Sequence, residues 1–304
     1  MKIYKCFPGG RFKALTMSYD DGYTEDEKLV AIFNQYGIKG TFNLNSGMFE
    51  ETYRGHKRVP KERIPELYKG HEVATHGYTH STIARCPLAE AAKDILRDRE
   101  ELEAVTGNLV RGHAYPNGSY NTEIKVLLKQ LGIAYGRVAE SSPQGRNPYA
   151  LPDDPMEWYP TCHHSAPDLM ERGKWLIEDQ KSWHLKLMYV WGHSFEFAEG
   201  NNWEIIEDFC KLMSGHDDIW YATNIEIIDY MEVLNRLCFS ADGRCVYNPS
   251  VQSAWLQVNG EQIVEVPGGE ITVMKNGKEI ARSASHEKSV SFLTDSLLGV
   301  LRGY

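Results

Sequence analysis

Hydrophobic and polar positions follow two different periods along residues 1–235, and segments of the two kinds alternate. Short apolar runs predict buried strands at residues 13–18, 40–45, 72–75, 133–136, 185–191 and 218–222. Between them, apolar residues recur every three or four positions, which predicts helices at residues 24–36, 65–69, 88–106, 124–131, 169–180, 205–214 and 225–236. This alternation predicts an α/β domain with a parallel sheet covered by helices, and a barrel fits the number of strands best.

The helix expected at residues 24–36 has polar and glycine residues at its two ends. Thr24 is followed three residues later by Glu27, a spacing typical of a capped helix start. Gly37 directly follows the last apolar turn, and glycine commonly ends a helix in the left-handed conformation. We therefore expect Thr24 to cap this helix and Gly37 to end it.

From about residue 239 the helical period disappears, and turn signals separate short apolar runs. The turn signals are SADGRC, YNPS, VNGE, VPGGE and KNGKE. The pattern predicts a large α/β domain at residues 1–237, which would carry the active site, and a small β-rich extension at residues 238–304. About 65 residues bury little core alone, so the extension is expected to pack on the main domain or on a second copy of the chain. The sequence leaves a homo-oligomer open.

Charge and composition exclude some classes of partner. The 304 residues carry a formal net charge of −9, which argues against nucleic-acid binding and against docking on anionic membranes. Neither a signal peptide nor a membrane span is visible, which favours a cytoplasmic protein. The six cysteines form no CxxC pair and are interpreted as reduced structural thiols.

Two motifs at predicted strand ends carry metal-type chemistry. The first is SYDDG, with adjacent carboxylates at Asp20 and Asp21, which could also be a plain acidic turn. The second is HGYTH, in which His76 and His80 could converge on one cation or be one core and one surface histidine. In a barrel, the C-terminal ends of the strands meet at one face, so these side chains are expected to lie together.

Two later motifs offer groups for polarising a substrate and for proton transfer. RGHAYPNGSYN contains a tight turn at Asn117 whose backbone N–H could face a substrate oxygen, or the segment could be a plain loop. YVWGHSFEF places His193 at a strand end among aromatic residues, where it could act as a general acid or be a core histidine. Nearby aromatic residues could stack on a sugar ring or fill the core: Tyr115, Trp158, Trp191 and Phe195.

The order of these four motifs on a strand–helix scaffold resembles the polysaccharide deacetylase family, also called carbohydrate esterase family four, with its NodB-homology domain. The resemblance covers about residues 12–235, and its specific part is the pair SYDDG and HGYTH. It implies a distorted parallel (β/α) barrel of about seven strands. It also implies Asp20 as the general base, and Asp21, His76 and His80 as the ligands of a divalent metal. His193 then matches the general acid, and Asn117 the residue whose N–H helps to form the oxyanion hole.

The chain departs from the family pattern in two places. The third motif of the family carries an arginine that tethers the base, but Ala114 stands at that position here. Arg111 and Arg137 are the nearby arginines, and Arg137 is the favoured substitute because it follows a predicted strand. The fourth motif, which supports the acid, is echoed only by residues 153–158. His163 and His164, which follow, could border the cleft or lie on the surface.

The resemblance implies a metal-dependent hydrolase that removes N- or O-linked acetyl groups from a carbohydrate. The metal is expected to be zinc, with cobalt, nickel or manganese as alternatives, because a His₂Asp set discriminates weakly between them. Two other hypotheses remain: a hydrolase of a non-sugar cyclic amide on the same barrel, and a non-catalytic sugar-binding protein.

Overall fold

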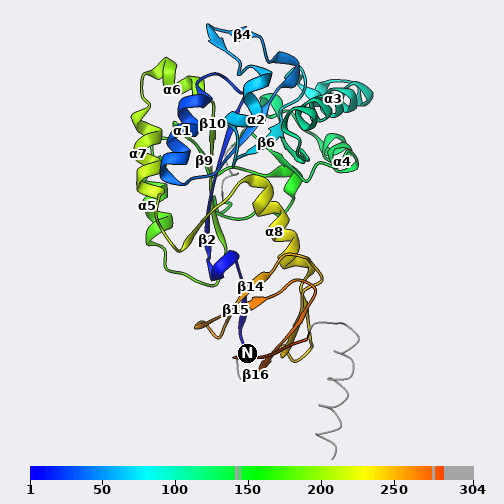
Figure 1. Cartoon of the computed structure of the whole chain (residues 1–304), viewed down its shortest axis with the longest axis vertical. Coiled ribbons are helices and arrows are strands. Elements are labelled where there is room, and N and C mark those ends of the chain that lie inside the picture. The colour runs from blue at the N-terminus through cyan, green and yellow to red at the C-terminus, as the bar shows by residue number, and fades with distance from the viewer. Residues whose placement is uncertain (141–142, 144, 276–277, 284–304) are drawn as a thin grey trace, which may run out of the picture. The chain divides into compact units, whose positions relative to one another are not determined.

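The computed structural model describes residues 1–140, 143, 145–275 and 278–283, and the chain divides into two compact units (Figure 1). The larger unit comprises residues 13–180 and 186–228. The smaller unit comprises residues 1–12 and 181–185 together with the chain from residue 229 onward. The sequence-based boundary after residue 237 stays a prediction. Among the described residues, no helix has both the length and the apolar character needed to span a bilayer.

The larger unit contains, within its described residues, an eight-stranded sheet in which all pairings are parallel. Its strands are β2 (Lys13–Asp20), β3 (Gly40–Leu44), β6 (Glu72–Thr75), β7 (Gly112–Ala114), β8 (Tyr135–Arg137), β9 (Cys162–His163), β10 (Lys186–Gly192) and β11 (Ile219–Tyr221). The order is β8-β7-β6-β3-β2-β10-β9, and β11 pairs with the start of β2. Every residue of β2 is buried, as expected for a parallel strand covered on both faces.

An irregular segment connects the two edges of this sheet. Trp158 pairs with Arg137 of β8 in a parallel bridge, and its carbonyl accepts a hydrogen bond of 3.1 Å from the N–H of Val138. Four residues later β9 pairs with β10, and the N–H of His164 donates to the carbonyl of Trp191 at 2.8 Å. The chain from Trp158 to His164 therefore closes the curled sheet, which gives the distorted barrel that the sequence predicted.

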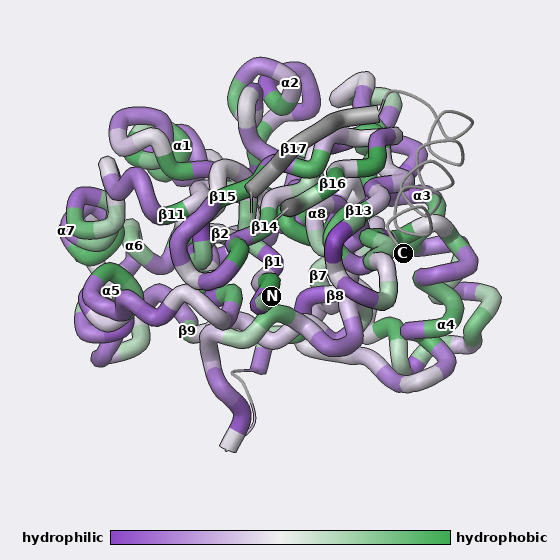
Figure 2. Tube along the Cα trace, turned by 90° about the horizontal axis from the view of Figure 1, so that it is seen from below, coloured by the Kyte–Doolittle hydropathy of each residue, from purple (hydrophilic) through white to green (hydrophobic). Residues whose placement is uncertain are grey.

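Helices cover the outside of the sheet. They are α1 (Asp26–Tyr36), α2 (Ile64–Leu67), α3 (Leu88–Thr106), α4 (Thr122–Gln130), α5 (Leu169–Glu178), α6 (Ser194–Gly200) and α7 (Glu204–Met213). Helix α8 (Asn224–Arg236) begins in the larger unit, and its residues from 229 onward belong to the smaller one. In Figure 1, α1, α5 and α7 lie on one side of the sheet, and α3 and α4 lie on the other. Figure 2 shows hydrophilic and hydrophobic stretches in turn along α5 and α7, as amphipathic surface helices require.

The two ends of α1 can be compared with the caps that the sequence predicted. Gly37 ends this helix with φ 65°, and its N–H donates to the carbonyl of Asn34, so the predicted C-terminal cap is confirmed. The prediction for Thr24 is wrong, because Glu25 is the N-cap residue of α1 and this helix start has no side-chain capping hydrogen bond. The hydroxyl of Thr24 instead lies 3.4 Å from the Glu25 carboxylate, and its backbone N–H donates to Lys57.

Several short elements connect the barrel strands. Single 3₁₀ turns lie at Ser46–Met48, Lys61–Arg63, Ile83–Arg85, Pro116–Gly118 and Pro155–Glu157, and another, at Pro8–Gly10, belongs to the smaller unit. A small hairpin is formed by β4 (Thr52–Tyr53) and β5 (His56–Lys57). The core between α1, α7 and the sheet contains large apolar side chains, among them Leu29, Phe33, Phe42, Met188 and Phe209.

The smaller unit is rich in antiparallel β-structure, which confirms the predicted β-rich C-terminal part. Its strands are β1 (Ile3–Cys6), β12 (Cys238–Phe239), β13 (Cys245–Tyr247), β14 (Ala254–Val258), β15 (Gln262–Val266), β16 (Ile271–Lys275) and β17 (Lys278–Ser283). Tyr230 joins its parts, since the hydroxyl donates to Cys6 and accepts from the N–H of Trp255. The turn expected at residues 276–277 and the end of the predicted extension, 284–304, lie outside the described residues. All six cysteines lie within the described residues, and their thiols are free.

Candidate active site and metal centre

Three residues of the predicted site have left-handed backbone conformations. Asp21 follows the end of β2 with φ 81°, His80 has φ 55°, and Asn117 has φ 56°. Residues other than glycine seldom adopt such angles, which cost about 1–3 kcal/mol each and persist where the surrounding structure imposes them. The local structure therefore holds these three residues in conformations that the chain alone would avoid.

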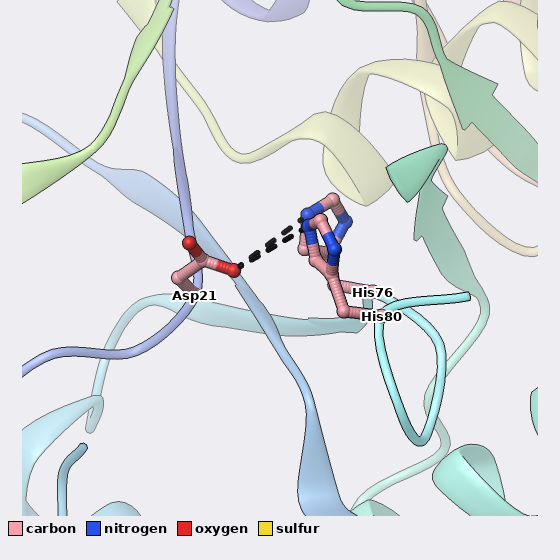
Figure 3. A group of neighbouring side chains, drawn as sticks. All are labelled: Asp21, His76 and His80. Carbon is pink, nitrogen blue, oxygen red and sulfur yellow. Dashed lines mark ion pairs between the residues drawn. The ribbon is translucent and has the colours of Figure 1, made fainter. Parts of the chain in front are cut away.

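Asp21, His76 and His80 point toward one another at the end of β2 and β6 (Figure 3). Oδ1 of Asp21 lies 3.9 Å from Nε2 of His76 and 3.8 Å from Nε2 of His80. One ligand atom from each of the three residues lies within 4.8 Å of the other two. The structure thus brings together the three residues that the sequence resemblance proposed as metal ligands.

His76 is held in the protonation state that a metal ligand requires. Its ring Nδ1 lies 2.8 Å from the carbonyl oxygen of Ala114, which can only accept, so Nδ1 carries the proton and Nε2 keeps its lone pair. The backbone N–H of His76 also donates to the buried carboxylate of Asp98 at 3.0 Å. Burial lowers the pKa of His76 to about 4, so the ring is neutral at pH 7. The backbone carbonyl of Ala114 therefore fixes the tautomer and the orientation of the His76 ring.

Arg58 contacts Asp21 and was missed by the sequence reasoning. Its Nη1 lies 3.2 Å from Oδ1 of Asp21 and also donates to the Asp21 carbonyl. Its guanidinium carbon lies 4.1 Å from the ring centroid of Tyr23. Within the described residues, Oδ1 of Asp21 has no partner of hydrogen-bond geometry. This buried, anionic oxygen facing two imidazole nitrogens fits a divalent cation.

Asp20 is the neighbour of Asp21 but lies in a different environment. Nη2 of Arg137, a fully buried side chain, donates to both carboxylate oxygens of Asp20. The side-chain amide of Asn43 donates to Oδ1 at 2.8 Å. Burial raises the pKa of Asp20, but the positive charge of Arg137 outweighs it and holds the pKa well below its usual range. Oδ2 of Asp20 lies 3.8 Å from Nε2 of His76, so an ionised carboxylate borders the candidate metal centre.

Asn117 lies in the 3₁₀ turn Pro116–Gly118, close in sequence to β7. Its side-chain amide donates to the hydroxyl of Thr82 at 3.2 Å, which holds the turn against the HGYTH segment. Gly77 of that segment would bring an added Cβ to 3.4 Å from Pro116. The turn therefore packs directly beside the loop that carries His76 and His80.

His193 follows β10 and is the N-cap residue of α6. Its Nδ1 lies 3.4 Å from Oε1 of Glu196. Burial lowers the pKa of His193, but the contact with Glu196 and the negative charges of Asp20 and Asp21 raise it above its ordinary value. His193 is therefore charged to a higher pH than a free imidazole, as a general acid requires.

Glu196 is surrounded by imidazoles, which the sequence reasoning did not foresee although it lies within YVWGHSFEF. Its Oε2 lies 3.2 Å from Nε2 of His163 and 3.1 Å from Nε2 of His164. The carboxylates of the expected fourth motif are bound elsewhere: Asp153 pairs with Arg146 and Asp154 with Lys125. Glu196, and neither of those aspartates, is therefore the carboxylate beside His193.

The aromatic residues considered for sugar stacking divide into core and surface. Tyr115 and Trp158 are 1% exposed, and Phe195 is 9% exposed, so these three fill the core. Trp191 is half-buried, and the guanidinium carbon of Arg137 lies 4.6 Å from its ring centroid. Of the four, Trp191 alone keeps a partly open face.

A family model matches part of the chain. Residues 9–136 match the family model for polysaccharide deacetylase, in agreement with the resemblance and the class of enzyme that the sequence predicted. This part of the chain contains SYDDG, HGYTH and the turn at Asn117. The family is generally metal-dependent, and the chain has a group of residues that could hold the metal. Comparison with curated proteins gives no match.

Solved structures of related fold have low sequence identity. A polysaccharide deacetylase described as putative, from Mycobacterium smegmatis, is 16% identical with a TM-score of 0.55; the match covers 76% of this chain and 94% of that one. The Xyl-CE4 domain of a multidomain xylanase from the hindgut metagenome of Trinervitermes trinervoides is 14% identical, with a TM-score of 0.49 and coverages of 73% and 92%. A Streptococcus pyogenes deacetylase solved with acetate is 17% identical, with a TM-score of 0.39, and the match covers 41% of this chain and only 55% of that one. The first of these confirms the barrel fold.

Proposed function

We propose that this chain is a metal-dependent deacetylase that hydrolyses N- or O-linked acetyl groups of a carbohydrate. The observation that carries the proposal is the position of Asp20. Its carboxylate is bound by Arg137 and reaches to 3.8 Å from His76, directly beside the Asp21–His76–His80 group. A base adjoining a cation site is the arrangement needed to activate a water molecule for attack on an acyl carbon.

Asp21, His76 and His80 would hold the metal, for which zinc is the first candidate and cobalt, nickel or manganese are alternatives. When bound, a divalent cation supplies a Lewis acid that polarises the acetyl carbonyl and makes a neighbouring water more acidic. The fixed tautomer of His76 and the left-handed backbone of Asp21 and His80 prepare the ligands for this cation.

Asp20 would accept the proton of the attacking water. Its low pKa keeps it ionised at neutral pH, and the contacts with Arg137 and Asn43 fix the direction of its oxygens. Arg137 is then a positioning residue, which takes the place of the arginine that the family carries at the position of Ala114. The Asn117 N–H would donate to the oxygen that becomes negative in the tetrahedral intermediate.

His193 would protonate the leaving amine or alcohol. Its raised pKa keeps a proton available near neutral pH, and Glu196 orients the ring from the first turn of α6. The carboxylate and the imidazole would thus act at opposite ends of the reaction, one accepting a proton and the other donating one.

The proposal is tested by measuring acetate release from a panel of acetylated mono- and oligosaccharides, with and without a chelator. We expect release from at least one sugar, loss of release with the chelator, and recovery on adding back zinc. Asp20→Asn should keep the metal but not the activity. A protein that binds metal but releases no acetate from any sugar, and instead opens a cyclic amide, would contradict the carbohydrate assignment.

A further inference from the structure

A second group of metal-type ligands lies beside the proposed acid. His163, His193 and Glu196 each offer one ligand atom within 4.8 Å of the other two. The side chains of His163 and Glu196 are 25% and 33% exposed, whereas Nδ1 of His193 is buried and has no partner of hydrogen-bond geometry among the described residues. The group comes from β9, the end of β10 and the first turn of α6, which are adjacent in the barrel.

The distances in this group suit a cation as well as a proton. Glu196 lies 3.2 Å from Nε2 of His163 and 3.4 Å from Nδ1 of His193. Hydrogen bonds between charged nitrogen and oxygen are usually shorter, about 2.7–2.9 Å. Two ligand atoms of a tetrahedral zinc, each about 2.0–2.2 Å from the metal, lie roughly 3.3 Å apart. Each histidine is therefore spaced from one oxygen of Glu196, Oε2 for His163 and Oε1 for His193, as two ligands of one cation would be.

Two neighbours orient the group. The backbone N–H of Ser165 donates to Nδ1 of His163 at 3.2 Å, and the Ser165 hydroxyl lies 2.8 Å from the same nitrogen. In the neutral ring Nε2 therefore carries the proton toward Glu196, and a metal that binds there displaces it. His164 is 3% exposed, is stacked between Tyr19 and Phe197, and holds Glu196 through its Nε2 at 3.1 Å. Gly192 makes room for this ring, because an added Cβ there would lie 2.0 Å from Nδ1 of His164.

We propose that His163, His193 and Glu196 form a second site for a divalent cation such as zinc, weaker than the Asp21–His76–His80 site, which inhibits the enzyme when filled. The site is weaker because Glu196 already accepts hydrogen bonds from histidines, so the ion must displace protons that hold the group together. The inhibition rests on the proposed function of His193. An imidazole that binds a metal through Nδ1 cannot be the protonated imidazolium, so it no longer donates a proton to the leaving group.

The binding part is tested on the full-length chain stripped with chelator and titrated with zinc, using calorimetry and elemental analysis. We expect two events in the wild type, one tight and one weaker. His163→Ala should keep the tight event and weaken the other by more than about tenfold, since even outer-shell changes cost 10–100-fold. The double variant Asp21→Asn, His80→Ala should lose the tight event and keep the weak one. His184→Ala removes an exposed histidine outside both groups and should keep both. A single event in the wild type, or two unchanged events in His163→Ala, would overturn the site.

The inhibitory part is tested by measuring acetate release between one and many equivalents of zinc. Wild-type turnover should fall as the weak site fills, whereas turnover of His163→Ala should not fall over the same range. Two binding events without inhibition would refute the role of His193 and leave the second site standing. Inhibition that His163→Ala does not relieve would refute the link between this site and the inhibition.

Discussion

The larger unit contains two groups that each consist of two imidazoles and one carboxylate. The two groups differ in the distances between these side chains and in how firmly the backbone holds them. In the Asp21–His76–His80 group, the carboxylate lies 3.8–3.9 Å from both imidazoles, too far for hydrogen bonds. In the His163–His193–Glu196 group, the corresponding distances are 3.2 and 3.4 Å. The carboxylate of the second group therefore lies closer to its imidazole nitrogens than the carboxylate of the first group does.

The difference shows that the set of donor atoms does not decide affinity by itself. His76 has its proton fixed on the far nitrogen by a backbone carbonyl, and two of the three ligands of its group are held in the left-handed region. The second group lies on an ordinary strand end and helix start, and its carboxylate pairs with the two imidazoles. We therefore expect preorganisation by the backbone to give the first group a higher affinity for a metal than the second.

The largest expected effect comes from removing the carboxylate of the first group. Asp21→Ala should lose the tightly bound metal and reduce acetate release below detection, because only two imidazoles remain as ligands and the anionic oxygen is gone. Elemental analysis and acetate release measure both effects. Asp153→Ala, which removes a carboxylate that is 95% exposed, is the matched control and should change neither quantity.

Asp20→Asn should separate chemistry from metal binding. The amide has nearly the shape of the carboxylate but cannot accept the proton of the water, so kcat should fall about 10²–10⁴-fold. Metal content should stay at the wild-type level, since Asp20 is not one of the three ligands. Near-wild-type turnover in this variant would show that the base is another residue.

Arg137→Met should affect stability as well as turnover. It leaves the buried carboxylate of Asp20 without its cation, which costs about 3–5 kcal/mol in comparable buried pairs. Adding Asp20→Asn in the same chain should recover most of the lost stability but none of the activity. If the double variant is as unstable as Arg137→Met, the loss comes from packing and not from the unpaired charge.

Glu196→Gln should shift the pH dependence of turnover, measured with one zinc per chain. His193 must be protonated to act as an acid, so turnover is lost as the pH rises through its pKa. Glu196 helps to raise this pKa, and removing its charge should therefore move the alkaline limb to lower pH. An unmoved alkaline limb would argue that His193 is not the acid.

The smallest expected effect concerns a buried carboxylate that belongs to neither of the two groups. Glu72, at the opposite end of β6 from His76, accepts hydrogen bonds from Thr41, Tyr135 and the N–H of Ile225. Burial raises its pKa to about 7, so its stabilising contribution is complete below the usual pKa of 4.5 and is lost as the pH rises through 7. Between pH 5 and 8, the melting temperature of the wild type should fall relative to that of Glu72→Gln. The slope should not exceed about 1.4 kcal/mol per pH unit. Parallel curves would contradict the raised pKa.

Much of the barrel could be predicted because its longer strands and helices carry a clear period. Residues 72–75 and 88–106 were assigned within their observed bounds, and Asp20, His76 and His193 were found because each follows such a strand. The strands β7 and β9 were missed. They contain three and two residues, and their pairing depends on neighbours that are distant in sequence. Helix α6 was missed because it starts directly after β10, where the apolar pattern does not change.

The site was predictable where one motif contains its own chemistry, and less so where two segments meet. Arg58 reaches Asp21 from the segment after a small hairpin, which no periodic pattern placed. Glu196 is part of a quoted motif, but its importance depends on His163 and His164, which reach it only because β9 pairs with β10. Arg137 was named from its strand-end position, and the structure gives that contact with Asp20.

At the left-handed residues of the site, thermal stability and activity favour different amino acids. Glycine at position 21 or 80 would relieve a backbone penalty of about 1–3 kcal/mol while removing a ligand. A library of variants selected for thermal stability alone is therefore expected to enrich these glycine replacements and to yield stable but inactive proteins. Selection has to include catalysis at every round, because at these positions tolerance to heat and catalytic competence favour opposite residues.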